Sequence, residues 1–291
     1  MANPTETAAP PSMNELPQAT IEFYRDAMRA LEDAGVPFLV GGAHAFGRYT
    51  GIVRYTKDFD IFVQPADFER ALDTFMRQGW QTERSFPHWL GKAHLDEDFV
   101  DVIFSSGNGV ARVDDLWFEK AVAGKVLNQD VKLVPVEEMI WSKSFIMERE
   151  RFDGADVAHL LRCCASDLDW ERLLSRFEAH DGWPVLFVHL VLFGYIYPGD
   201  AKRIPAGVLE RLMDRLRRDM QHPDAADPLL CRGPILSRSQ YLIDLYRWGY
   251  QDARLRPQGN MSAEDIEQWT VAAEKDGDIT QYQALEDPHS P

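Results

Sequence analysis

The chain has 291 residues, a length typical of one large domain or two smaller ones. Hydrophobic residues make up 45% and charged residues 27%, which excludes wholesale disorder. With 31 basic and 47 acidic side chains, the net charge of −16 argues against a broad basic surface for duplex DNA but not against a local basic site. Cys163, Cys164 and Cys231 fit neither a disulfide framework nor a zinc site, and they predict reduced thiols in a cytoplasmic protein.

The N-terminal half alternates apolar runs with helical patterns. Residues 1–16 lack the basic and apolar regions of a signal peptide and predict a disordered leader. Apolar residues at helical spacing predict helices at 18–35, at 43–49, from Pro65 onward and at 135–147. Short apolar runs predict buried strands at 36–40, 59–63, 99–104 and 131–134.

From about residue 154 onward, the pattern is helical throughout. Helices are predicted at 156–164, 168–177, 183–197 and 205–220, with a loop at 221–234. The most apolar stretch, 183–197, is too short to span a membrane and predicts a buried helix. From residue 262, eight acids against one lysine predict a solvated acidic end with one short helix.

These patterns predict an α+β fold, with a small mixed β-sheet and its helices followed by an all-α C-terminal extension. We divide the chain into a leader at 1–16, an α/β domain at 17–165, a helical domain at 166–260 and an acidic tail at 261–291.

Three acids interrupt the predicted apolar strands. Asp58 and Asp60 lie two apart in KDFDIFV, so a strand places both side chains on one face, and Asp101 lies within FVDVIF. A buried carboxylate is unfavourable unless it is paired or binds a metal, and Mg²⁺ is the cation that such oxygens suit best. The alternative is that these are strand-end acids satisfied by neighbouring N–H groups.

The surroundings of these acids favour a phosphate-binding site. Gly41 and Gly42 end a predicted strand and begin a helix, and Asp58 lies 16 positions after Gly42. Glycines there let the backbone approach phosphate oxygens, and the helix N-terminus adds N–H donors. Between the glycines and the acids, GIVRYTK places Arg54 and Lys57 beside the carboxylates.

Four blocks in this order resemble the polymerase-β-type nucleotidyltransferase superfamily, in particular its minimal bacterial domains, including toxin-like members. The matching segments are LVGGA at 39–43, RYTKDFDI at 54–61, VDV at 100–102, and 134–161, where Lys143 precedes an R-x-D-x-x-D run. The resemblance covers about residues 20–165, while residues 166–291 match only loosely.

The resemblance implies transfer of a nucleoside monophosphate from an NTP to a hydroxyl acceptor, with release of pyrophosphate. Asp58 and Asp60 would bind two Mg²⁺ ions, or Mn²⁺ in their place, and Asp101 would hold the metal nearer the acceptor and accept its proton. Gly41, Gly42, Arg54, Lys57 and Lys143 are the implied nucleotide-binding residues. His44 departs from the family pattern, and we interpret it as a helix residue that faces solvent or the core.

Three alternatives stay open from the sequence. One is a metal-dependent D-x-D glycosyltransferase, which does not need the glycine turn or the third acid. Another is a catalytically silent nucleotidyltransferase-like module that binds or regulates a partner. The third is a toxin-type enzyme that modifies tRNA or protein and has an antitoxin partner, with Lys202-Arg203 and the arginines at 211–218 as candidate basic patches. The acceptor (small molecule, tRNA or protein) is therefore not defined, and no membrane partner is expected.

Overall fold

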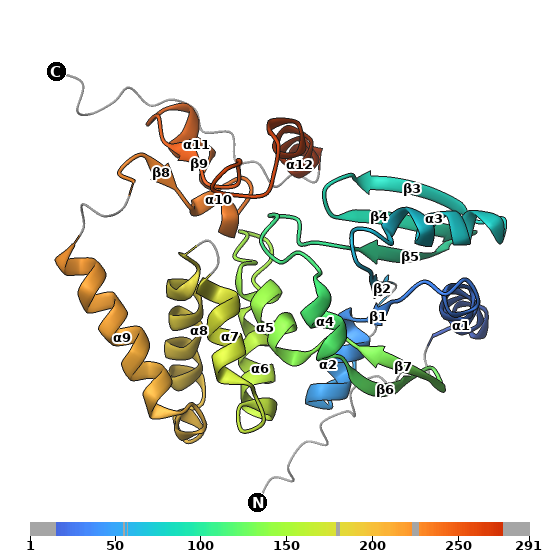
Figure 1. Ribbon diagram of the computed structural model, residues 1–291, viewed down its shortest axis with the longest axis horizontal. Helices are drawn as coiled ribbons and strands as arrows, with labels where there is room; N and C mark the ends of the chain where they lie inside the picture. The colour runs from blue at the N-terminus through green and yellow to red at the C-terminus, as the bar shows by residue number, and fades with distance from the viewer. Residues whose placement is uncertain (1–15, 55, 57, 179–180, 223–226, 276–291) are drawn as a thin grey trace, which may run out of the picture. The chain divides into compact units, whose positions relative to one another are not determined.

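The computed structural model describes residues 16–275, apart from 55, 57, 179–180 and 223–226. The chain folds into two compact units (Figure 1). The first comprises the chain up to Ser105 together with Val113–Met139, and the second comprises Ser106–Arg112 and the chain from Ile140 onward. The predicted fold class is confirmed, since a mixed sheet with helices is followed by a mostly helical unit. The domain boundary at 165, which follows the extent of the family resemblance, stays a prediction.

Within the described residues, the sheet of the first unit has seven strands in the order β3-β4-β5-β2-β1-β7-β6. The strands are β1 (Leu39–Val40), β2 (Asp58–Phe62), β3 (Gln81–Phe86), β4 (Leu90–Leu95), β5 (Asp98–Ile103), β6 (Val122–Val126) and β7 (Gln129–Leu133). The pairs β2–β5 and β1–β7 are parallel, and the other pairs are antiparallel. The sheet is therefore mixed, as expected.

Helices cover one face of the strands β3, β4 and β5. Helices α1 (Gln18–Asp33) and α3 (Phe68–Arg77) pack against these strands and against each other (Figure 1). Tyr24 of α1 stacks on Phe59 of β2 with ring centroids 4.6 Å apart. Because side chains alternate along a strand, Asp58 and Asp60 point away from Phe59 and from this helical layer. The opposite face of β2 is therefore available for a polar site.

Three shorter helices complete the first unit or leave it. Helix α2 (Gly42–Thr50) follows β1 directly, and α4 (Asp115–Glu119) precedes β6. Helix α5 (Val136–Ser144) begins in the first unit and ends in the second. These boundaries lie close to those predicted for the helices at 43–49 and 135–147.

Strands β3, β4 and β6 are absent from the sequence-based prediction. Their sequences, QTERSF, LGKAHL and VAGKV, contain glycine and charged residues instead of a continuous apolar run. Such strands have one solvated face and are held by pairing with their neighbours rather than by burial on both faces. The hairpin of β4 and β5 has one local sequence signal, the two-residue turn Asp96-Glu97. Aspartate tolerates a left-handed backbone, and Asp96 has a φ of 52°.

The second unit is built mainly from helices. They are α6 (Gly154–Cys164), α7 (Trp170–Glu178), α8 (Trp183–Ile196), η3 (Ala201–Arg203), α9 (Ala206–Gln221), α10 (Gly233–Leu236), α11 (Leu242–Tyr246) and α12 (Ala263–Lys275). A short parallel pair of β8 (Leu230–Cys231) and β9 (Gln251–Asp252) is an exception to the expected all-helical pattern. Within the described residues, no disulfide joins Cys163, Cys164 and Cys231. Residues 1–15 of the predicted leader, and the tail beyond residue 275, lie outside the described residues.

Helix α8 corrects one expectation. It was predicted to be buried, but only one face is covered, through Trp183, Leu186, His189, Leu190 and Phe193. Its other face exposes apolar side chains, namely Val188, Val191, Tyr195 and Ile196. Uniform apolarity hides which face packs, and this explains the wrong prediction. None of the described helices is long and apolar enough to cross a membrane.

Candidate active site

The three predicted carboxylates lie on two neighbouring strands. Strands β2 and β5 pair in parallel, with Asp60 opposite Asp101 and Asp58 opposite Phe99. Residues opposite each other in such a pair point to the same side of the sheet, so Asp58, Asp60 and Asp101 share one face. The sheet register thus brings together three acids that are separated by up to 43 positions in the chain, since 101 − 58 = 43.

The glycine turn lies directly against this acidic face. Gly42 has a φ of +52°, and a Cβ placed on it would stand 1.6 Å from Oδ2 of Asp60. Gly41 donates its N–H to the carbonyl oxygen of Asp60 at 3.0 Å, and a Cβ on it would stand 2.2 Å from the Phe62 ring. A side chain at position 42 would be strained and would displace the Asp60 carboxylate, and one at position 41 would require the Phe62 ring to move. The N-terminus of α2 begins beside the Asp60 carboxylate.

A basic residue that the sequence pattern did not reveal belongs to this site. Lys92 of β4 is the cross-strand partner of Asp101, and its Nζ lies 2.5 Å from Oδ1 of Asp101. The Lys92 ammonium also lies over the Phe99 ring, 4.1 Å from its centroid. Because β4 was not predicted, no signal placed Lys92 opposite Asp101. The alternation of Leu90, Lys92 and His94 with small residues is the pattern that would have revealed the strand.

Burial and charge oppose each other at Asp101. Burial raises the pKa of Asp101 above its ordinary value, and the Asp58 charge acts in the same direction. The hydrogen bond and charge of Lys92 oppose this shift without cancelling it, so the pKa stays raised. Asp101 is thus a carboxylate whose proton affinity is increased by its position in the sheet.

The residues at this face suit a hard divalent cation in their chemistry, since all the predicted ligands are carboxylate oxygens. Across the residues that the structure describes, however, no three Asp, Glu, His or Cys side chains are gathered closely enough to hold a metal ion. The cation that Asp101 contacts is the Lys92 ammonium. The two-metal role of Asp58, Asp60 and Asp101 therefore stays a prediction.

The three basic residues that are predicted to bind phosphate differ in where the structure places them. The Arg54 guanidinium stacks over the ring of Phe46 in α2, 4.6 Å from its centroid. Lys57 lies outside the described residues. Lys143 belongs to the second compact unit, whereas the carboxylates and the glycine turn belong to the first. The predicted contacts of these residues with a nucleotide remain predictions.

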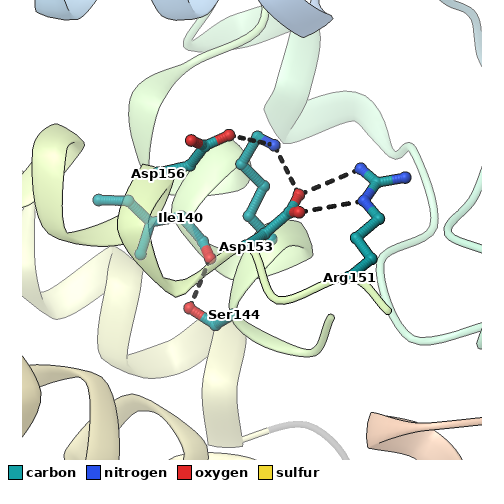
Figure 2. Close-up of polar contacts among 6 residues, drawn as sticks. Ile140, Ser144, Arg151, Asp153 and Asp156 are labelled. Carbon is teal, nitrogen blue, oxygen red and sulfur yellow. Dashed lines mark hydrogen bonds and ion pairs between the residues drawn. The ribbon is translucent and has the colours of Figure 1, made fainter. Parts of the chain in front are cut away.

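Lys143 is engaged by the R-x-D-x-x-D run that follows it. Its Nζ lies 2.7 Å from Asp153 and 2.9 Å from Asp156, and its side chain is only 18% exposed. Arg151 donates from Nε and Nη2 to the two oxygens of Asp153, at 3.0 and 3.1 Å (Figure 2). Burial raises the pKa of Asp153, but Arg151 and Lys143 outweigh it and hold that pKa below its ordinary value. Lys143 therefore does not face bulk solvent.

His44, the residue that departs from the family pattern, is a core residue. Its ring packs edge-on against Phe59, with centroids 5.1 Å apart, on the helical side of β2. Within the described part of the chain, neither ring nitrogen has a hydrogen-bond partner. Burial lowers the pKa of His44 to about 4, so the ring is neutral at physiological pH.

The candidate basic patch on α9 is largely neutralised. Arg211 binds Glu171 and Glu178 at 2.9 and 2.8 Å, and Arg217 binds Asp214 at 2.6 Å. Two further ion pairs in this region join Arg215 to Asp181 and Arg203 to Asp200. Arginines that are already paired with carboxylates offer little to a polyanion.

Comparison with known proteins gives structural neighbours only. No protein-family model and no curated protein matches the chain. The antibiotic-resistance factor ANT(2'')-Ia matches with a TM-score of 0.44 and 13% identity over 60% of this chain and 97% of its own. The lincosamide antibiotic adenylyltransferase LnuA, in its lincomycin-bound form, matches with a TM-score of 0.36 and 12% identity over 50% and 96%.

A nucleotidyltransferase-like antigenic protein from Paracoccidioides brasiliensis matches with a TM-score of 0.43 and 13% identity, over 69% of this chain and 100% of its own. These neighbours are nucleotidyltransferases or nucleotidyltransferase-like by name. At such TM-scores and identities the similarity carries no argument about activity, so function rests on the residues of this chain.

Proposed function

We propose that this protein is a metal-dependent nucleotidyltransferase, which transfers a nucleoside monophosphate from an NTP to a hydroxyl acceptor and releases pyrophosphate. The observation that carries the proposal is the parallel register of β2 and β5. It sets Asp60 opposite Asp101 on one face of the sheet. The Asp60 carboxylate occupies the space that a side chain at position 42 would need. A helix N-terminus beside the carboxylate face of the sheet combines a phosphate-binding element with oxygens of the kind that bind Mg²⁺.

Each group has a defined role in the proposal. Asp58, Asp60 and Asp101 would hold Mg²⁺, which when bound neutralises charge on the phosphate oxygens. Asp101, whose pKa is raised, would take the proton of the acceptor hydroxyl as the new phosphate ester bond forms and the bond to pyrophosphate breaks. The N–H groups at the start of α2 would bind the triphosphate, and Arg54 and Lys57 would balance its charge. For Lys143, which belongs to the other unit, this role rests on the resemblance alone.

The charges of the protein favour an acceptor that is not a polyanion. The net charge is −16, and Arg211, Arg215 and Arg217 of α9 are paired with acids. We therefore rank a small molecule or a protein above tRNA as the acceptor. A toxin role with an antitoxin partner, and a cytoplasmic location, are parts of the proposal that rest on the resemblance and composition alone.

The experiment that tests the proposal is incubation with each α-labelled NTP and Mg²⁺, with and without total RNA and cell extract. The proposal expects label to move to an acceptor in a Mg²⁺-dependent reaction. If no labelled product forms under any condition, the nucleotidyltransferase proposal is wrong, and the silent binding module becomes the better account.

A further inference from the structure

The acidic face continues across four strands as a row of charged side chains. Asp60 of β2 lies opposite Asp101 of β5, Asp101 lies opposite Lys92 of β4, and Lys92 lies opposite Glu83 of β3. All four side chains point to the same face, since opposite residues in a sheet share a side. One lysine is therefore fixed by register between two acidic neighbours.

Lys92 contacts one of these neighbours and not the other. Its Nζ lies 2.5 Å from Asp101, and the two side chains are 23% and 13% exposed. Glu83 is directed elsewhere, accepting a hydrogen bond from Ser85 at 2.8 Å and lying 3.6 Å from His94. The Phe99 ring under the Lys92 ammonium supports the same position. Lys92 is thus aimed at the acid that the proposed reaction needs.

This arrangement places a single positive charge where a divalent cation would bind. Asp60 and Asp101 are like charges directly opposite each other, a destabilising pair unless a cation is nearby. Lys92 supplies a cation to Asp101 from within the chain. A metal ion that binds Asp101 has to compete with the ammonium for the same oxygens, and at a few ångströms the two cations repel each other.

We propose that Lys92 is a positioning residue that acts as a built-in counter-ion, holding Asp101 in the metal-free protein and releasing it when a divalent cation binds. The inference rests on the proposed function, since that function assigns Asp101 to the metal site. It assigns Lys92 a function beyond a structural cross-strand pair, because the ammonium weakens binding of free metal.

The test is a titration of the full chain with Mn²⁺ alone, at neutral pH and without nucleotide, following free Mn²⁺ by electron paramagnetic resonance. Lys92→Met keeps the apolar stem over Phe99 and removes the charge. It is expected to bind Mn²⁺ about tenfold more tightly than the wild type, from the repulsion removed. Lys125→Met removes an exposed lysine of β6 in the same unit and is expected to leave the affinity unchanged.

Two further variants make the result specific. Lys92→Gln removes the charge but keeps a donor for Asp101, and it replaces Lys92→Met if that variant does not fold. In a Lys92→Met/Asp101→Asn double variant, the gain in affinity is expected to disappear. Equal or weaker Mn²⁺ binding in both single Lys92 variants, no binding in any variant, or a gain that persists in the double variant overturns the inference.

Label transfer by the wild type separates this inference from the proposed function. If the wild type transfers label but the wild type and the Lys92 variants bind Mn²⁺ with equal affinity, only the role of Lys92 is overturned. If the Lys92 variants bind Mn²⁺ more tightly but the wild type transfers no label, the counter-ion role of Lys92 stands and the nucleotidyltransferase proposal is overturned.

Discussion

At the scale of single residues, the Gly42 position links backbone conformation to the Asp60 carboxylate. Both Gly42 and Gly51 have left-handed φ angles, +52° and +72°, but only Gly42 lies against another side chain. Alanine at either site is expected to lower the free energy of unfolding by about 1 kcal/mol, the strain of a left-handed non-glycine residue.

Gly42→Ala is expected to differ from Gly51→Ala in activity, not in stability. The new Cβ displaces Asp60, and a misplaced reacting group lowers the rate by about 100-fold. Urea unfolding and label transfer measured on both variants check this expectation. Equal transfer rates in the two variants would show that Asp60 does not have to occupy its place beside residue 42.

His44 is expected to make the protein sensitive to acid. The pKa of His44 is about 4 in the folded chain, against an ordinary value of 6.5, so the unfolded chain binds the proton more readily. Stability is therefore full above pH 6.5 and is lost as the pH falls toward 4, by about 2–3 kcal/mol at pH 4.5.

The measurement is urea unfolding of wild type and His44→Phe at pH 7.5 and pH 4.5. The variant is expected to lose less stability between these pH values, while His222→Gln, which changes an exposed histidine, is expected to behave like the wild type. An unchanged pH dependence in His44→Phe would mean that other groups are responsible for the loss in acid.

At the scale of elements, the cluster between α5 and the start of α6 is expected to stabilise the second unit. Lys143 neutralises Asp153 and Asp156, which are 9% and 7% exposed. Lys143→Ala leaves both buried carboxylates with less compensation and is expected to lower the free energy of unfolding by about 2 kcal/mol. Lys125→Ala breaks only an exposed pair and is expected to change it by less than about 0.5 kcal/mol.

Urea unfolding of both lysine variants, with Lys143→Ala/Asp156→Asn as a third, checks this prediction. The double variant is expected to recover part of the loss, because one uncompensated charge is removed. A loss in Lys143→Ala no larger than that in Lys125→Ala would contradict it. Weaker NTP binding by folded Lys143→Ala, measured separately, would support the role that the resemblance gives this lysine.

The strands that the sequence predicts well are those that contain a short run of apolar residues. Strands β1, β2, β5 and β7 appear as apolar runs, and the acids that interrupt two of those runs form the candidate site. Strands β3, β4 and β6 are half-solvated, so their patterns resemble loops, and Lys92 was missed together with β4. Pairing partners far apart in the chain decide where a charged side chain points, and local patterns do not contain that information.

At the scale of the whole molecule, the net negative charge and the ion pairs of the surface arginines both disfavour binding to nucleic acid. The net charge of −16 and the paired arginines of the second unit keep nonspecific attraction to nucleic acid low. The first unit combines the glycine turn, the carboxylates and Lys92 on one sheet, so the proposed chemistry depends mainly on this unit. Residues 166–291 resemble the family only loosely, and the motifs of the first unit do not define their role.

The central claim is that the carboxylates of β2 and β5 support transfer of a nucleoside monophosphate. Its most direct measurement compares Mg²⁺-dependent transfer of α-label by the wild type, Asp60→Asn and Asp130→Asn. Asp130 is an exposed acid of β7 in the same unit and serves as the matched control. We expect Asp60→Asn to remove at least about 100-fold of the activity while thermal unfolding stays cooperative, and Asp130→Asn to leave transfer unchanged. Transfer by Asp60→Asn at the wild-type rate would contradict the claim.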